Sequence, residues 1–142
     1  MNYWLFKCNT DMYDLESRLQ DLNPTITWNV SRYRKEIKKG DQVFLWVSGK
    51  KGGVRAVFEI DTPPIEMAEI ESEKPYWKTK DKPVRLRVIG TLSKTNKFIP
   101  AEQVKQKASL KNMSIFGYPG ATNYPVTKKE GNAILSLLEK TK

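Results

Sequence analysis

A β-hairpin is the predicted feature that most constrains the fold of this sequence. The continuous apolar run QVFLWVS at residues 42–48 is followed by the glycine-rich segment 49–53 and by the apolar stretch VRAVFEI at residues 54–60. Two strand-like runs joined by a short loop that contains glycine are typical of a hairpin. Because the first run is apolar throughout, we expect it to be a central strand, and we expect Pro63-Pro64 to end the second strand.

Further strands are predicted on both sides of this hairpin. Residues 2–7 suit a buried strand, and VRLRVI at residues 84–89 alternates apolar and basic side chains, as a strand with one wet, positive face does. We expect residues 65–83 to cross the surface. These elements predict a single domain over residues 1–142, α/β of the α+β kind, with a small mixed or barrel-like sheet and helices around it.

Helices are predicted where helix-start or helix-stop signals flank suitable segments. In the first, apolar residues recur at helical spacing, and in the last, a capping box precedes an apolar face. The first expected helix starts at Thr10 or Asp11 and has Met12, Leu15, Leu19 and Leu22 on one face. Three more are expected at residues 32–38, at residues 100–107 and after the capping box TKKE at residues 127–130.

The charge balance favours a polyanionic partner. The 25 Lys and Arg residues against 16 Asp and Glu residues give a formal net charge of +9, which favours nucleic acid or an acidic membrane surface. No stretch approaches the roughly 18 apolar residues of a membrane span, so we expect a soluble protein. The N-terminus does not have the pattern of a secretory signal, and the single cysteine, Cys8, excludes an internal disulfide framework. We therefore expect a cytoplasmic protein.

Few groups in the sequence are suited to catalysis. Histidine is absent, which removes the commonest general acid or base and the commonest metal ligand. The acidic residues between 66 and 73 do not have the spacing of a calcium loop, and residues 49–53 lie between two strands, unlike a phosphate-binding loop. Asp11, Asp14 and Glu16 are better explained as favourable charges at a helix N-terminus. We expect no catalytic residue, no metal and no cofactor.

The four tryptophans divide into two pairs. Trp4 and Trp46 lie in apolar, strand-like runs and are expected in the core, whereas Trp28 and Trp77 stand among polar or basic residues in segments that do not look like core strands. A base that stacks on an aromatic ring contributes roughly 1–3 kcal/mol, and neighbouring Lys and Arg side chains bind the flanking phosphates. From these residues alone, a core role and a binding role for Trp28 are equally supported.

Several short motifs, taken in order, resemble the EVE domain family and cover nearly the whole chain. The resemblance implies a PUA-like fold, which is a curved, partly closed mixed β-barrel with surrounding helices. It also implies kinship with YTH domains, which hold a methylated adenine in an aromatic cage. The motifs are YWLFK at residues 3–7, TWNV at 27–30, IKKGDQVFLWVSG at 37–49, GVRAV at 53–57, PYW at 75–77 and LKNM at 110–113.

The same resemblance implies a base-binding pocket. Trp28 corresponds to the first cage tryptophan, and Asn29 corresponds to the next residue, which contacts the base edge. Lys7 and Asn9 correspond to the polar end of the first strand, and Trp77 lies in the loop that supplies another wall. Many YTH domains have Ser or Cys at the position of Asn29, which leaves the preferred base open. The expected phosphate contacts are the basic residues behind the first tryptophan, Arg32, Arg34 and Lys35.

We interpret the chain as a non-enzymatic reader of a modified base, with methylation the expected modification, that is flipped out of DNA or RNA into an aromatic pocket. Two alternatives stay open. One is a general RNA-binding module of the PUA type without a base pocket, and the other is an enzyme that acts on a nucleotide through carboxylates. We expect a monomer that binds nucleic acid and not membrane. EVE domains are also found attached to modification-dependent restriction systems, so a restriction or nuclease partner is a further expectation.

Overall fold

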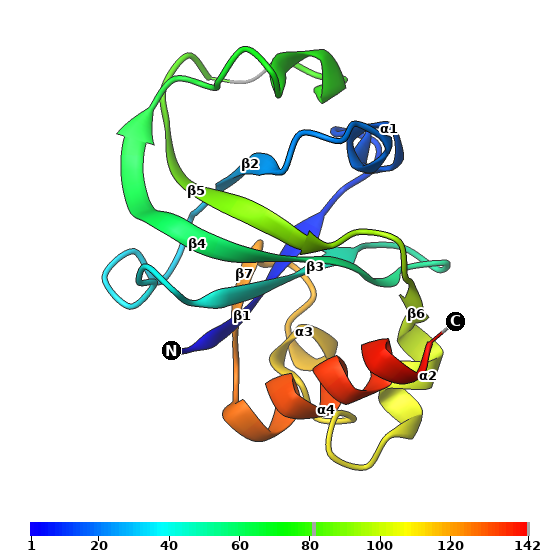
Figure 1. The fold of residues 1–142 in the computed structure, drawn as a ribbon. Coiled ribbons are helices and arrows are strands. Elements are labelled where there is room, and N and C mark those ends of the chain that lie inside the picture. Colours follow the sequence, from blue (N-terminus) through cyan, green and yellow to red (C-terminus); the bar gives the residue numbers. More distant parts are fainter. Residues whose placement is uncertain (81, 142) are drawn as a thin grey trace.

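One mixed sheet runs through the computed structural model, which describes residues 1–80 and 82–141 (Figure 1). Its strands are β1 (Tyr3–Cys8), β2 (Thr25–Asn29), β3 (Gln42–Val47), β4 (Gly53–Met67), β5 (Arg85–Lys94), β6 (Ile99–Pro100) and β7 (Asn123–Val126). Their order is β2-β5-β4-β3-β1-β7, with β6 paired to β4. β1 and β3 are parallel, and the other neighbours are antiparallel. Within the described chain β2 and β7 do not pair, so the curved sheet is not closed into a barrel.

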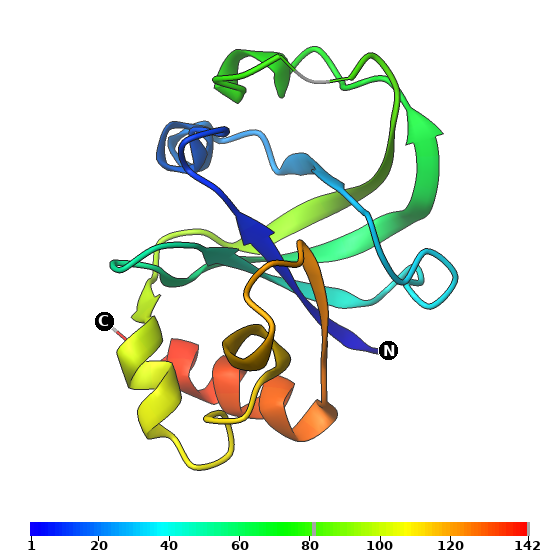
Figure 2. The same cartoon turned by 180° about the vertical axis from the view of Figure 1, so that it is seen from behind.

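Helices lie on both sides of this sheet. They are α1 (Leu15–Gln20), the short 3-10 helix η1 (Lys74–Tyr76), α2 (Ala101–Gln106), α3 (Ser114–Gly117) and α4 (Lys128–Lys140). Figures 1 and 2 show α2, α3 and α4 gathered on one side, while α1 and the segment around η1 lie on the other. α4 begins at the predicted capping box, because Thr127 Oγ1 accepts a hydrogen bond from the Glu130 amide at 3.1 Å. In the described ranges no helix has the length and apolarity that crossing a membrane requires.

Two hydrophobic cores result from the alternation of side chains along the strands. In β1, Trp4 and Phe6 point to one face, and Tyr3 and Leu5 point to the other. The α1-side core consists of Trp4, Phe6, Cys8, Tyr13, Leu15, Leu19, Ile26, Trp28, Val30, Ile37, Val43, Leu45, Ala56, Phe58, Ile60 and Val88. The α4-side core consists of Tyr3, Leu5, Phe44, Trp46, Val54, Val57, Ile99, Val104, Leu110, Met113, Ile115, Tyr124, Val126, Ile134 and Leu138.

The hairpin prediction is confirmed, except for the end of its second strand. β3 lies inside the sheet and pairs antiparallel with β4, and both tryptophans assigned to the core, Trp4 and Trp46, are buried. Pro63-Pro64 does not end β4, which continues to Met67. The pairing of β4 with β5 shifts register near these prolines, and such irregularities accommodate residues that cannot donate to the ladder.

The first predicted helix has a different start. α1 begins after Asp14, whose side chain accepts a hydrogen bond from the Ser17 amide at 3.2 Å, so neither Thr10 nor Asp11 is its cap. Met12, expected on the apolar face of this helix, precedes it and is exposed. The start of this helix was therefore predicted wrongly.

The helix predicted at residues 32–38 is absent from the described chain, where this segment forms turns. Tyr33 has a φ angle of 63°, in the left-handed region that interrupts a helix. The turn before β3 is instead organised by Asp41, whose Oδ2 accepts hydrogen bonds from the Lys38 amide and from Trp4 Nε1, both at 2.9 Å.

Candidate functional site

A cavity of about 680 Å³ lies where the ends of several strands meet. It is lined by the C-terminal ends of β1 and β2, the start of β5 and the segment that follows η1. Its volume falls within the range of small-molecule sites. The structure brings together, in the lining of this cavity, all five residues that were expected in a base-binding pocket: Lys7, Asn9, Trp28, Asn29 and Trp77.

Trp28 belongs both to the α1-side core and to the wall of this cavity. It is the second-last residue of β2, paired with Val88 of β5, and 7% of its surface is exposed. The expectation that Trp28 lies outside a regular strand is therefore wrong. The sequence offered a core role and a binding role as alternatives, and the geometry allows both, because one ring contacts the core and the cavity.

Tyr13 joins the two tryptophans of the cavity. Its ring centroid lies 5.2 Å from that of Trp28 and 5.0 Å from that of Trp77, with interplanar angles of 81° and 64°. Such edge-to-face contacts are favourable for aromatic rings. The backbone also links these segments, since Tyr13 and Trp77 form an antiparallel bridge and the Lys78 amide donates to the Met12 carbonyl at 2.8 Å. Sequence reasoning did not identify Tyr13, because nothing near it in the chain indicates a ligand.

A buried ion pair fixes Tyr13 from behind. Tyr13 Oη donates a hydrogen bond to Glu73 Oε1 at 2.8 Å, and Arg18 Nε donates to Glu73 Oε2, with both charged side chains fully buried. Arg18 Nη2 also donates to the carbonyls of Asn23 and Thr25. Burial and the neighbouring carboxylate raise the pKa of Tyr13, so its hydroxyl stays a neutral donor. Burial also raises the pKa of Glu73, and the guanidinium of Arg18 opposes that shift.

Glu69 holds the second tryptophan in place. Trp77 Nε1 donates to Glu69 Oε2 at 2.8 Å, and Thr27 Oγ1 of β2 donates to Glu69 Oε1 at 2.5 Å. Arg87 Nε lies 3.7 Å from the same carboxylate, and the side chain of Arg87 is fully buried. The expected wet, positive face of residues 84–89 is therefore wrong for Arg87, while Arg85 does reach the cavity.

The amides of the lining residues are held differently. Asn29 Oδ1 is buried and, among the described atoms, has no hydrogen-bond partner. Its backbone carbonyl accepts from Asn123 Nδ2 at 3.2 Å, and Asn123 Oδ1 accepts from the Ser31 amide at 2.8 Å, so a side chain of β7 links to the end of β2. Asn9 Oδ1 accepts from the Asp11 amide at 3.0 Å. A buried acceptor without a partner is unfavourable, so Asn29 favours a ligand that donates an N–H group.

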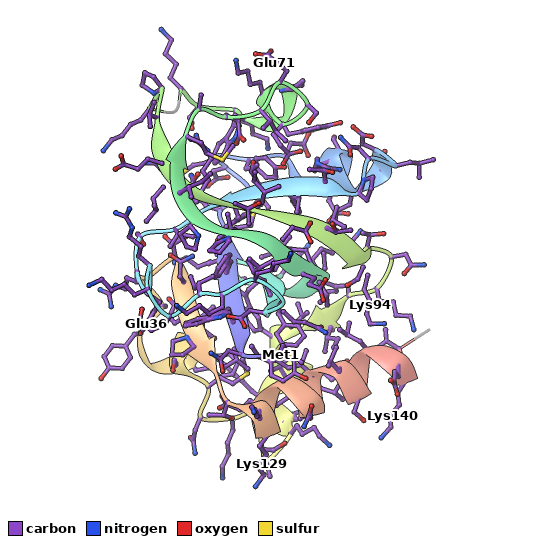
Figure 3. All side chains as sticks on the ribbon, turned by 60° about the vertical axis from the view of Figure 1, so that its left-hand side comes forward. Met1, Glu36, Glu71, Lys94, Lys129 and Lys140 are labelled. Atoms are coloured by element: carbon purple, nitrogen blue, oxygen red, sulfur yellow. The ribbon has the colours of Figure 1, made fainter. Side chains whose placement is uncertain are left out.

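The cationic side chains at the cavity differ from those expected to bind phosphate. The residues expected to do so lie on the loop between β2 and β3, are exposed and are not part of the lining. Figure 3 shows Glu36 of that loop well separated from Glu71, which lies near η1. The phosphate role of Arg32, Arg34 and Lys35 stays a prediction. The basic residues that line the cavity are Lys7, Lys80, Lys82 and Arg85.

Candidate catalytic groups in this region have structural partners. Cys8 lines the cavity, but burial raises its pKa to about 12, so the thiol stays protonated. The carboxylate of Asp14 accepts hydrogen bonds from the amide and the hydroxyl of Ser17, and these bonds lower its pKa. Over residues 1–80 and 82–141, no group of three or more His, Cys, Asp or Glu side chains is arranged to hold a metal ion.

A family model, that of the EVE domain, matches residues 2–137. The chain belongs to the EVE domain family. The EVE resemblance read from the sequence motifs is thereby confirmed, and the cavity described above lies within the matched range of this EVE domain.

Solved structures also resemble this EVE domain. A hypothetical protein from Leishmania major has a TM-score of 0.70 at 20% identity, covering 99% of this chain and 96% of that one. The human THYN1 protein, in complex with DNA that contains 5-methylcytosine, has a TM-score of 0.70 at 21% identity and covers 98% of each chain. A Pseudomonas syringae protein has a TM-score of 0.68 at 21% identity, covering 95% of this chain and 98% of that one. These likenesses concern the fold and confirm its predicted class. A search of curated proteins gave no match.

Proposed function

We propose that this EVE domain binds nucleic acid and holds one modified base in the cavity. The observation that carries the proposal is the joint lining of one cavity by Trp28 and Trp77, with basic side chains beside them. Aromatic rings bind the flat faces of bases, and Lys and Arg side chains bind phosphates. The complex of the structurally similar human THYN1 protein with DNA that contains 5-methylcytosine supports the proposal.

A base held in the cavity must first leave its stack, and contacts in the cavity offset the free energy that this costs. Flipping a base costs a few kcal/mol in a duplex and less in a single strand. Stacking on Trp28 and a hydrogen bond to the unpartnered Asn29 Oδ1 offset that cost. Met12 and Val84 line the cavity with apolar surface. A methyl group buried there would contribute about 0.8 kcal/mol.

Replacement of Trp28 tests the proposal. We expect Trp28→Ala to weaken binding of an oligonucleotide that carries the modified base by about 5- to 150-fold, because one stacked base is lost, and to abolish the preference over the unmodified oligonucleotide. Fluorescence anisotropy at fixed salt concentration measures both quantities. Trp46→Phe, a tryptophan replacement in the α4-side core, is the matched control and should bind as the wild type does.

Trp28 also packs in the core, so circular dichroism must show that the variant is folded. Trp77 is only half-buried, and Trp77→Ala therefore gives a second test with less risk to the fold. Unchanged affinity and unchanged preference in both variants would exclude a base held between these rings.

A second candidate function, general RNA binding without a base pocket, is favoured by the exposed basic residues outside the cavity, among them Arg32, Arg34 and Lys35. Binding through phosphates weakens steeply with salt, whereas stacking and hydrogen bonds to a base do not. We expect the preference for the modified oligonucleotide to persist as salt is raised from 50 to roughly 200 mM. A preference that disappears together with the affinity would favour the general RNA-binding module.

A further inference from the structure

Most of the net positive charge lies in the last third of the chain. Residues 94–142 contain nine lysines, three glutamates and neither arginine nor aspartate, so they carry six of the nine net positive charges. This third supplies α2, α3 and α4, which lie on one side of the sheet (Figures 1 and 2). These three helices and the turns at residues 107–113 form the helix layer. Its exposed lysines are Lys105, Lys107, Lys111, Lys128, Lys129 and Lys140.

The carboxylates of the protein do not neutralise these six lysines. Over residues 1–80 and 82–141, none of the six forms an ion pair. Glu130, one of the three glutamates of the layer, is held in the capping box of α4, where it accepts a hydrogen bond from the amide of the capping residue at 2.9 Å. On the other side of the sheet, by contrast, Arg18 and Arg87 lie beside Glu73 and Glu69. The helix layer therefore has an excess of positive charge that no ion pair compensates.

Two of these lysines stand where helix stability disfavours a cation. Lys128 and Lys129 are the first two residues of α4. The N-terminal end of the helix dipole is positive, so acidic side chains are favourable there and basic ones are not. Helix formation does not account for these two charges, and departures of this kind from local rules occur mainly where a function needs them.

The helix layer and the cavity lie in different parts of the molecule. Figure 3 shows Lys129 and Lys140 at one end of the molecule and Glu71, next to η1, at the other. Of the described residues between 94 and 141, only Thr122 lines the cavity. A nucleic-acid segment that places a base in the cavity therefore leaves the lysines of α4 free for another ligand.

The side chains of the helix layer suit a polyanion that is bound through charge. Lysine is a point charge on a flexible stem and lacks the planar fork with which arginine binds one carboxylate or phosphate through two hydrogen bonds. Protein interfaces have an apolar centre and are depleted in lysine, whereas Tyr118 is the one large exposed apolar residue of the described chain that adjoins this layer in sequence. A nucleic-acid backbone presents closely spaced phosphates and releases counterions when lysines neutralise them, so it fits this surface best.

We propose that the helix layer binds the phosphate backbone of a second nucleic-acid segment, so that the domain bridges this segment and the one whose base occupies the cavity. The bridging rests on the proposed function, whereas the site on the helix layer does not. Binding there is independent of sequence and of base modification, because lysines that contact phosphates do not read base edges. The domain then has one selective and one unselective nucleic-acid site, on different sides of its sheet.

The salt dependence of binding to an unmodified DNA duplex tests the site. We expect Lys128→Gln/Lys129→Gln to lower the slope of log affinity against log salt concentration by about 0.9 for each lysine that contacts a phosphate. Lys128→Arg/Lys129→Arg keeps the charge and should keep the slope. The matched control is Lys38→Gln/Lys39→Gln, which removes the same charge from another exposed pair of adjacent lysines and should not change the slope.

Capture of a second duplex tests the bridging. An immobilised duplex that contains 5-methylcytosine is loaded with protein and then exposed to a fluorescent, unmodified duplex, which the wild type should retain. The variant Lys107→Gln/Lys111→Gln/Lys128→Gln/Lys129→Gln should still bind the immobilised duplex and should lose the captured fluorescence. Trp28→Ala, at the cavity, should keep the wild-type salt slope on the unmodified duplex.

The outcomes separate this inference from the proposed function. An unchanged slope in Lys128→Gln/Lys129→Gln would overturn the site, and so would an equal change in Lys38→Gln/Lys39→Gln, because total charge would then explain the effect. Polyglutamate or vesicles that contain phosphatidylserine, bound as tightly as DNA and through the same lysines, would overturn the assignment to nucleic acid. The expected change of slope without capture of a second duplex would overturn the bridging alone. The expected change of slope in a protein that does not prefer the modified duplex would support the site and overturn the proposed function.

Discussion

The two hydrophobic cores differ in what they bury. The α4-side core is made of apolar and aromatic residues and is covered by α2, α3 and α4 (Figure 1). The α1-side core has charged residues in its surroundings, because Asp41 accepts a hydrogen bond from Trp4 and Glu73 accepts one from Tyr13 and pairs with Arg18. It also borders the cavity. One side of the sheet is thus closed, and the other contains polar groups and an opening.

The two cores therefore differ in role: one mainly stabilises the fold, and the other positions the residues of the cavity. Apolar burial stabilises roughly in proportion to the area removed from water, and the α4-side core provides it without buried charges. A buried ion pair loses much of its Coulomb attraction to desolvation, so it adds little net stability. We infer that Arg18 and Glu73 serve to orient Tyr13, and through it the two tryptophans of the cavity.

The largest expected effect comes from breaking the buried pair. Glu73→Gln leaves the charge of Arg18 buried without its counter-charge, and we expect a loss of about 3–5 kcal/mol in the free energy of unfolding. Urea denaturation followed by tryptophan fluorescence measures it. The double variant Arg18→Met/Glu73→Leu removes both charges and should lose less than Glu73→Gln. A single variant as stable as the wild type would show that the pair is not a buried contact in solution.

A smaller loss of stability, without loss of binding, is expected on the other side of the sheet. Ile134 of α4 is fully buried in the α4-side core, and Ile134→Ala should cost about 3 kcal/mol by leaving a cavity. At a temperature where the variant stays folded, its affinity for the modified oligonucleotide should equal that of the wild type. A clear loss of affinity would show that the two cores are not independent.

Features that depend on local pattern could be predicted from the sequence. The hairpin follows from two apolar runs and a glycine-rich loop, and the start of α4 follows from a capping box that needs only Thr127 and Glu130. Their polar and basic neighbours singled out Trp28 and Trp77, and the resemblance to the EVE family assigned both to one pocket. Periodicity could not bring them together, because the two lie on separate segments.

Features that depend on contacts between distant segments could not be predicted. Tyr13 pairs with the chain after η1 at the cavity, and Arg87 is buried beside Glu69 and donates to the Met67 carbonyl. The basic stretch at residues 32–38 has helix-forming residues, yet its end is held in a turn. Asp41 Oδ2 accepts a hydrogen bond from the Lys38 amide and another from Trp4 Nε1 of the distant strand β1. In each case a tertiary partner outweighs local propensity.

The smallest of these effects on stability, and the sharpest for the comparison, concerns the gap between β2 and β7. Asn123 bridges it, since its Oδ1 accepts from the Ser31 amide and its Nδ2 donates to the Asn29 carbonyl. Asn123→Ala should cost about 1–3 kcal/mol, because it leaves backbone groups unpaired, and should also weaken binding several-fold, because Asn29 is no longer held. The matched control is Asn132→Ala on α4, where the lost bond is a part-buried contact from Tyr3 Oη. Equal binding by the two variants would mean that the open edge of the sheet does not position the cavity. A loss of affinity confined to Asn123→Ala would show that this one side chain links β7 to the end of β2, where the two strands do not pair through their backbones.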